Sequence, residues 1–186
     1  MGKRRLIGKI VILMLGLAAV VILAANSDTI PVSTPKKGYR VVIDPGHGGS
    51  DCGAVGVSGV KEAGLNLAVS LYLKEELEAL GMEAILTRSD ERALAEGKKE
   101  DMAARGKIMN GEGVDLVVSV HMNKFTDPSV HGPMAFYMKG SAEGEKLAKT
   151  VIDSITDELG APRRIANPGD YYVIRESMPV SVLVEC

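Results

Sequence analysis

The stretch RVVIDPGHGG, residues 40–49, is an apolar run that ends in a glycine-rich segment containing a histidine. Two further apolar runs end in a similar way: LVVSVH, residues 116–121, ends in a histidine, and VSVLVE, residues 180–185, ends in a glutamate. Short apolar runs bounded by turn residues are typical of buried β-strands. Because the ligand crevice of an open α/β sheet lies at the carboxyl ends of its strands, the sequence predicts that the two imidazoles and the carboxylate meet at one sheet edge.

Between these runs the pattern alternates between strands and helices. Residues 62–80 carry leucine and valine at i+4 spacing, which predicts an amphipathic helix that stops near Gly81. A second long helix is expected from Ser141, a favourable N-cap, to residue 159. The other expected elements are strands at 82–87, 134–138 and 171–174 and a short helix at 101–109. This order predicts an α/β fold with a mostly parallel twisted sheet and helices on both faces.

The N-terminus has a different character. Residues 10–25 are apolar and uncharged, and four basic residues precede them, which is typical of a transmembrane helix with a cytoplasmic N-terminus. A cleaved signal peptide is the alternative, although Leu-Ala-Ala at 23–25 is a poor cleavage site. We therefore expect a membrane anchor or signal segment at 1–25, a linker at 26–38 and one domain at 39–186. That domain is extracytoplasmic and membrane-anchored, or secreted if the segment is cleaved.

Charge and cysteine content exclude some classes of protein. The chain has 22 Lys and Arg against 24 Asp and Glu, and four of the basic residues precede the apolar N-terminal stretch. The remaining domain is acidic, which argues against a nucleic-acid partner, because such a partner requires a basic face.

Cys52 and Cys186 lack CxxC spacing, so a cysteine zinc site is not indicated. They pair only if the fold brings them together.

Four residues are candidates for metal-assisted hydrolysis. Zinc takes imidazole nitrogen and carboxylate oxygen, and a catalytic site keeps one position open for water. His47 and His121 are two candidate ligands, and Glu62, directly after the glycine-rich loop 46–59, is the best third. Glu185 ends an apolar strand, where an unpaired carboxylate is costly, but a carboxylate beside the reacting water can transfer its proton to a leaving amine. Each residue also has a purely structural alternative. His47 could be a loop histidine and His121 a core histidine. Glu62 could simply favour the start of a helix, and Glu185 could be the solvated end of a strand.

Several motifs resemble those of the zinc-dependent N-acetylmuramoyl-L-alanine amidases. VIDPGHGGSDCGAVG at 42–56 is similar to the opening motif of that family, and KE at 61–62 to its second motif. SVHMN at 119–123 is similar to the family's Ser-Ile-His-x-Asn motif, and PVSVLVE at 179–185 to the segment that carries its catalytic glutamate. The motifs occur in the family's order from residue 39 to the end of the chain.

The resemblance implies that His47, Glu62 and His121 bind Zn²⁺ and that Glu185 is the catalytic acid/base. The implied substrate is the amide between N-acetylmuramic acid and L-alanine in peptidoglycan. A short exported domain without wall-binding repeats resembles the spore-cortex branch of the family, the CwlD type. That branch implies a role in spore cortex maturation and leaves room for an activating lipoprotein or another regulatory partner.

Two other functions remain open from the residues alone: a zinc peptidase that acts on peptidoglycan stem peptides, and a non-catalytic wall-binding domain. Family members continue beyond the catalytic glutamate, whereas this chain stops at Cys186, so we expect a truncated C-terminus. Two roles are possible for Arg88: a contact with a carboxylate of the substrate, or a surface ion pair. Two roles are also possible for Asn123: orienting the site, or capping a turn.

Overall fold

The computed structural model describes residues 38–127, 129–162 and 165–186. The predicted anchor at 1–25 and nearly all of the predicted linker lie outside these residues. Within the described ranges, no helix combines the length and the apolar character needed to cross a membrane.

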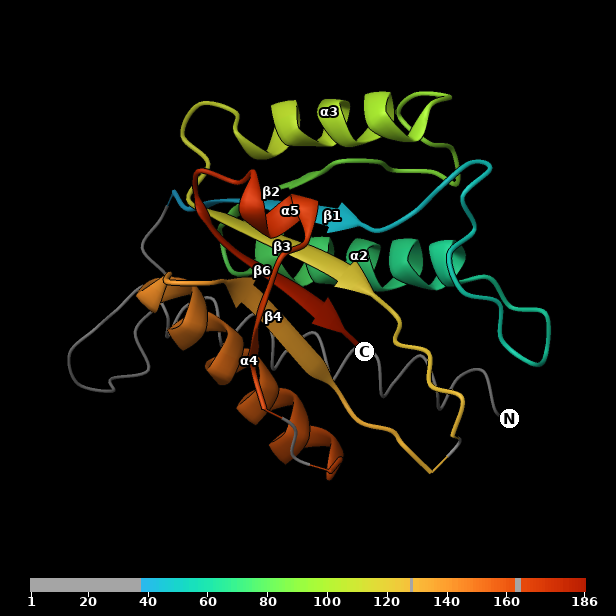
Figure 1. The fold of residues 1–186 in the computed structure, drawn as a ribbon. Helices are drawn as coiled ribbons and strands as arrows, with labels where there is room; N and C mark the ends of the chain where they lie inside the picture. Colours follow the sequence, from blue (N-terminus) through green and yellow to red (C-terminus); the bar gives the residue numbers. More distant parts are fainter. Residues whose placement is uncertain (1–37, 128, 163–164) are drawn as a thin grey trace.

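A six-stranded sheet in the order β2-β1-β3-β6-β4-β5 forms the centre of the molecule. Strands β2, β1, β3 and β6 run parallel, whereas β4 is antiparallel to β6 and parallel to β5. The arrows of β1, β3 and β6 accordingly point to one side in Figure 1, and that of β4 to the other. The strands are β1 (Arg40–Pro45), β2 (Glu83–Leu86), β3 (Leu116–His121), β4 (Met134–Met138), β5 (Asn167–Gly169) and β6 (Val180–Glu185).

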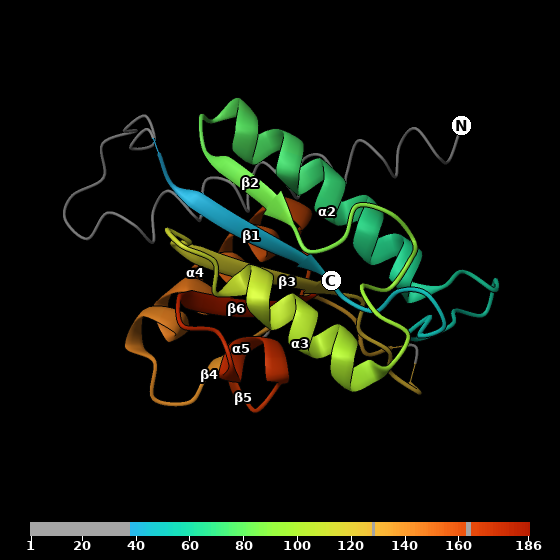
Figure 2. The same cartoon turned by 90° about the horizontal axis from the view of Figure 1, so that it is seen from above.

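Helices cover both faces of this sheet, as predicted. Their bounds are α2 (Glu62–Ala79), α3 (Lys98–Met109), α4 (Ala142–Leu159) and α5 (Tyr172–Arg175). Buried side chains of α2 and α4 share one core cluster with the strands, and those of α3 and α5 share the other. Figure 1 shows α3 and α5 above the sheet and α4 below it, and Figure 2 shows α3 crossing in front of the strands.

Strand β1 shows why the apolar runs do not alternate with polar residues. Val41 and Ile43 pack in the cluster that contains Leu73 of α2. Val42, between them, packs in the opposite cluster with Ile174 of α5. A strand that is buried on both faces needs apolar residues at successive positions.

The predicted helix ends are confirmed for the two long helices. Ser141 is the N-cap of α4, and its hydroxyl accepts a hydrogen bond from the Gly144 N–H at 3.0 Å. Gly160 ends that helix with a φ of 59°, a left-handed conformation that glycine adopts without strain. Gly81 follows α2 with a φ of 82°.

Two features of the sheet differ from the sequence prediction. The strand expected at 171–174 is wrong, because these residues form most of the short helix α5, which directs Val173 and Ile174 into the core against α3. Strand β5 was not predicted. The sheet is mostly parallel, as predicted, and is mixed only because β4 and β5 run against the other four strands.

Candidate metal centre

The carboxyl ends of β1, β3 and β6 place the predicted site residues at one edge of the sheet. The three strands are parallel, and their register aligns His121 with Glu185 and Pro45 with Val120. His47 lies two residues beyond the end of β1, and α2 begins at the same edge with Glu62. The structure therefore brings all four predicted residues together, although Glu62 comes from a helix and not from a strand.

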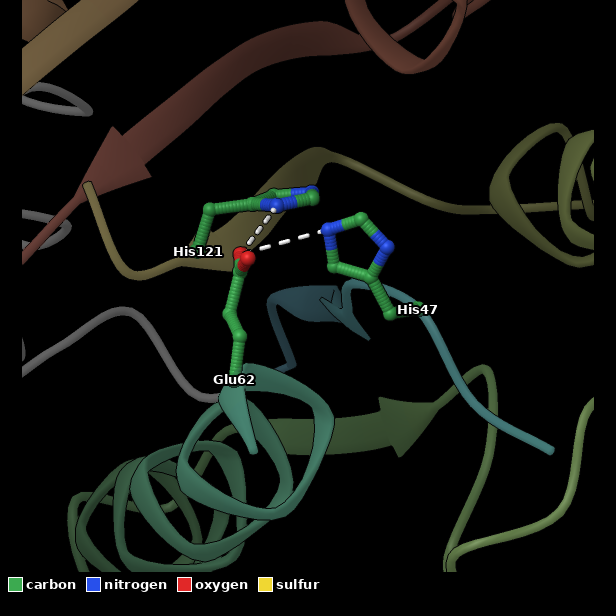
Figure 3. Close-up of side chains that lie close together, drawn as sticks. All are labelled: His47, Glu62 and His121. Carbon is green, nitrogen blue, oxygen red and sulfur yellow. Dashed lines mark hydrogen bonds and ion pairs between the residues drawn. The ribbon is translucent and has the colours of Figure 1, made fainter. Parts of the chain in front are cut away.

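His47, Glu62 and His121 point toward one another (Figure 3). Oε1 of Glu62 lies 3.0 Å from Nδ1 of His121 and 3.3 Å from Nε2 of His47. The two imidazole rings meet edge to face with their centroids 4.9 Å apart. Burial raises the pKa of the Glu62 carboxyl, but hydrogen bonds from His121 and His47 outweigh burial and bring the pKa well below its usual range. Glu62 is thus a carboxylate between two imidazoles.

This donor set fits a single metal ion. One ligand atom from each of the three side chains lies within 4.8 Å of the others. Tetrahedral zinc with bonds of about 2.1 Å holds its ligand atoms about 3.4 Å apart, close to the two nitrogen–oxygen distances at Glu62. Two nitrogens and one oxygen also leave a fourth position for a water molecule or a substrate. The three residues therefore form a potential metal-binding triad.

Glu185 lies beside the triad in the same cavity. The cavity has a volume of about 420 Å³, and His47, Glu62, His121 and Glu185 all line it. Burial raises the pKa of the Glu185 carboxyl, and the nearby Glu62 carboxylate raises this pKa further. His121 and His47 lower the pKa only in part, so the pKa of Glu185 stays above its usual range. A carboxyl with a raised pKa gives up and takes up protons more readily near neutral pH.

Comparison with known proteins identifies the family. Residues 41–186 match the N-acetylmuramoyl-L-alanine amidase family. The chain belongs to this family. The prediction that it is an amidase is therefore confirmed, and the site described above lies within the matched residues of this amidase.

The relatives support the narrower resemblance to the spore-cortex branch. The germination-specific N-acetylmuramoyl-L-alanine amidase of Bacillus subtilis is 31% identical over 169 residues, which span 86% of this chain and 71% of that protein. The CwlD amidase of Clostridioides difficile, solved in complex with the GerS lipoprotein, is 29% identical with a TM-score of 0.75 and covers 80% of this chain and 81% of its own. The N-acetylmuramoyl-L-alanine amidase of Clostridium difficile 630 is 27% identical, has a TM-score of 0.71, and covers 81% of this chain and 80% of its own.

Two glycines of the amidase make room for the triad. A Cβ atom at Gly46 would overlap the His121 ring. A Cβ at Gly53 would lie 2.6 Å from Oε2 of Glu62 and 2.7 Å from Cδ2 of His47. Glycine at these two positions of the opening motif is therefore a steric requirement of the site.

Backbone carbonyls of the segment that carries His47 are held by two buried arginines of the amidase. Arg88 donates to the Pro45 carbonyl at 3.0 Å and to the Gly46 carbonyl at 2.9 Å. Arg105 donates to Pro45 at 2.8 Å and to the His47 carbonyl at 2.6 Å. His47 has a φ of 62°, a left-handed conformation that is costly for a residue with a side chain. The arginine contacts stabilise this strained turn.

Arg105 is balanced by two carboxylates. Its guanidinium lies 2.7 Å from Asp44 and 2.7 Å from Asp101, and the side chains of both Arg105 and Asp44 are almost fully buried. Asp44 also accepts hydrogen bonds from Thr87 at 2.7 Å and Ser119 at 2.9 Å. Burial raises the pKa of Asp44, but Arg105 and the two hydroxyls outweigh it and hold the pKa below its usual range.

Glu62 is supported from three further directions. The backbone N–H of Ala54 donates to Oε2 at 2.8 Å, and that of Met122 donates to Oε1 at 3.2 Å. Asn66, fully buried one turn along α2, donates to Oε1 of Glu62 at 3.3 Å and to the Gly46 carbonyl at 3.2 Å. The carboxylate of this amidase is therefore fixed before any ion binds.

The burial of Arg88 and the role of Arg105 were not predicted from the sequence. Arg88 is neither a substrate contact nor a surface ion pair, because its side chain is buried and its hydrogen bonds go to backbone carbonyls. Asp44 was the feature of the sequence that could have indicated a buried arginine, because a carboxylate inside an apolar strand requires a cation or several hydrogen-bond donors. Asn123 fits both interpretations, since its Oδ1 accepts from the Lys124 N–H at 2.8 Å and the residue also lines the cavity.

Proposed function

We propose that the chain is a zinc-dependent hydrolase that cleaves the amide bond between N-acetylmuramic acid and L-alanine in peptidoglycan. The observation that carries this proposal is the convergence of His47, Glu62, His121 and Glu185 on one cavity in a chain of this family. The donor set favours zinc over magnesium or calcium, which take mainly oxygen ligands.

His47, Glu62 and His121 would hold the ion through two nitrogens and one oxygen. When bound, zinc supplies Lewis acidity toward the scissile carbonyl and lowers the pKa of a water molecule. The hydrogen bonds to Glu62 from Ala54, Met122 and Asn66 keep its carboxylate oriented, so little reorganisation is required on binding.

Glu185 would move the protons of the reaction. It takes a proton from the attacking water and delivers it to the amide nitrogen, which then leaves as the free amine of L-alanine. Two observations support this assignment: Glu185 pairs with His121 in the sheet register, and it is not part of the cluster of ligand atoms formed by His47, Glu62 and His121. The raised pKa of Glu185 suits a group that alternates between base and acid.

We further propose that this amidase acts in spore cortex maturation and is held at the outer face of the cytoplasmic membrane by residues 1–25, or is secreted if that segment is cleaved. The similarity to the germination-specific amidase and to CwlD supports the biological role. Because CwlD was solved with a lipoprotein, a lipoprotein partner is part of the proposal for this chain as well.

Mass analysis of digested peptidoglycan tests the reaction. The full chain, loaded with zinc, is incubated with purified cell wall, and the soluble products are weighed. The proposal predicts intact stem peptides with a free L-alanine amine, glycan strands without peptide, and loss of both after chelation. Shortened peptides would indicate a peptidase instead. Wall binding without any product would indicate a non-catalytic binding domain.

A further inference from the structure

Asp51 contacts the ring nitrogen of His47 that faces away from the triad. Its Oδ1 lies 3.0 Å from Nδ1 of His47, while Nε2 of the same ring lies 3.3 Å from Glu62. The two nitrogens of His47 therefore have different partners. An Nδ1–H that donates to a carboxylate leaves the lone pair of the imidazole on Nε2, the nitrogen that faces the triad.

The carboxylate of Asp51 is itself held in place, although the side chain is partly exposed. The Gly53 N–H donates to Oδ1 at 3.1 Å, and Nζ of Lys98 lies 3.7 Å from Oδ2. The backbone of Asp51 forms two hydrogen bonds with Gly48, at 2.8 and 3.1 Å. Both the main chain and the carboxylate of Asp51 are thus fixed relative to the turn that carries His47.

The rings of the two triad histidines are restricted by packing to a similar degree. A Cβ at Gly46 would overlap the ring of His121, and a Cβ at Gly53 would lie 2.7 Å from Cδ2 of His47. The His121 side chain is 19% exposed and that of His47 is 22% exposed. Packing of this kind does not distinguish one ring nitrogen of His47 from the other, so a hydrogen bond is needed to fix which nitrogen faces Glu62.

We propose that Asp51 is the positioning residue of His47: it accepts a hydrogen bond from Nδ1–H, fixes the tautomer and the ring orientation, and thereby strengthens Nε2 as a metal ligand. The inference rests on the proposed function, since it requires that the triad holds a metal ion. A carboxylate behind a metal-bound imidazole commonly contributes about 10- to 100-fold to metal affinity.

Zinc affinity, measured by competition with a chromophoric chelator, tests this role without any substrate. Asp51→Asn keeps an acceptor but loses the charge, and Asp51→Ala loses both. Affinity should fall modestly in the first and by about 10- to 100-fold in the second. Asp170→Asn is the matched control, because Asp170 pairs with Arg175, is largely exposed and does not line the cavity. That variant should bind zinc like the wild type. Thermal unfolding of the metal-free variants separates a binding defect from a folding defect.

A second readout follows the His47 ring directly. Long-range ¹H–¹⁵N spectra of the zinc-loaded wild type should show a His47 Nδ1–H that exchanges slowly with solvent, and the same proton in Asp51→Ala should exchange faster. Equal affinity and equal exchange in wild type and Asp51→Ala would overturn the role of Asp51 while leaving the amidase proposal intact. A wild-type chain that binds no zinc would overturn both.

Discussion

Replacing Gly46 by alanine adds one methyl group directly against a proposed metal ligand. Three atoms of the His121 imidazole lie too close to that Cβ, and even the farthest of them, Cδ2, would be 2.8 Å away. Carbon atoms settle at roughly 3.5–4.0 Å from one another, and the two nearer ring atoms overlap more severely. The ring therefore has to move by about 1 Å.

A displacement of this size is large for a metal site, where ligand distances are held to within about 0.2 Å. We expect Gly46→Ala to weaken zinc binding and to lower kcat/KM by about 100-fold or more, which corresponds to about 2.8 kcal/mol. Gly46 does not have a positive φ, so alanine introduces no backbone strain there and the effect reports on the ring alone.

The assay compares Gly46→Ala with Gly64→Ala, a matched change in the first turns of α2. A Cβ at Gly64 meets no atom within 4 Å, so this control should keep wild-type zinc affinity and amidase activity. Zinc affinity is measured by chelator competition, and activity by release of free L-alanine amines from cell wall. Zinc binding by Gly46→Ala within threefold of the wild type would refute the steric argument.

Three further predictions concern the groups around the triad. Arg105→Met leaves the buried Asp44 carboxylate without its cation and should lower the free energy of unfolding by about 3–5 kcal/mol in urea denaturation at pH 7; a loss below about 1 kcal/mol would contradict the buried pair. Because the pKa of Asp44 is lowered in the folded state, the stabilisation is present above the unfolded pKa of about 3.9 and is lost as pH falls below it. The difference between wild type and Arg105→Met should therefore shrink below about pH 4, and a pH-independent difference would argue against this linkage. Glu185→Gln should bind zinc like the wild type but lose turnover by about 100-fold or more, whereas lost zinc affinity would make Glu185 a ligand.

The grouping of site residues at one sheet edge was predictable because it depends only on local sequence patterns and on the order of the strands and helices. Apolar strands in an α/β order place their carboxyl ends together, so His47, His121 and Glu185 could be grouped from the sequence alone. Glu62 followed from its place at the start of a helix directly after a flexible loop. The pairing of His121 with Glu185 in adjacent strands is the structural result of that arrangement.

The features that could not be predicted from the sequence depend on tertiary contacts. Nothing local distinguishes a buried arginine from an exposed one, so Arg105 became meaningful only beside Asp44 and the His47 carbonyl. Residues 171–174 are aromatic and β-branched and favour a strand, but packing of Val173 and Ile174 under α3 selects one helical turn. The direction in which a strand runs in the sheet leaves no pattern in its sequence. The antiparallel direction of β4 relative to β6 was therefore not predicted.

Anomalous diffraction at the zinc edge, from crystals of the zinc-loaded protein, shows whether His47, Glu62 and His121 hold one zinc ion beside Glu185. We expect one strong peak at about 2.0–2.2 Å from a nitrogen of each histidine and an oxygen of Glu62, with Glu185 outside bonding distance. A peak elsewhere, or none between these three side chains, would mean that they are not the zinc ligands.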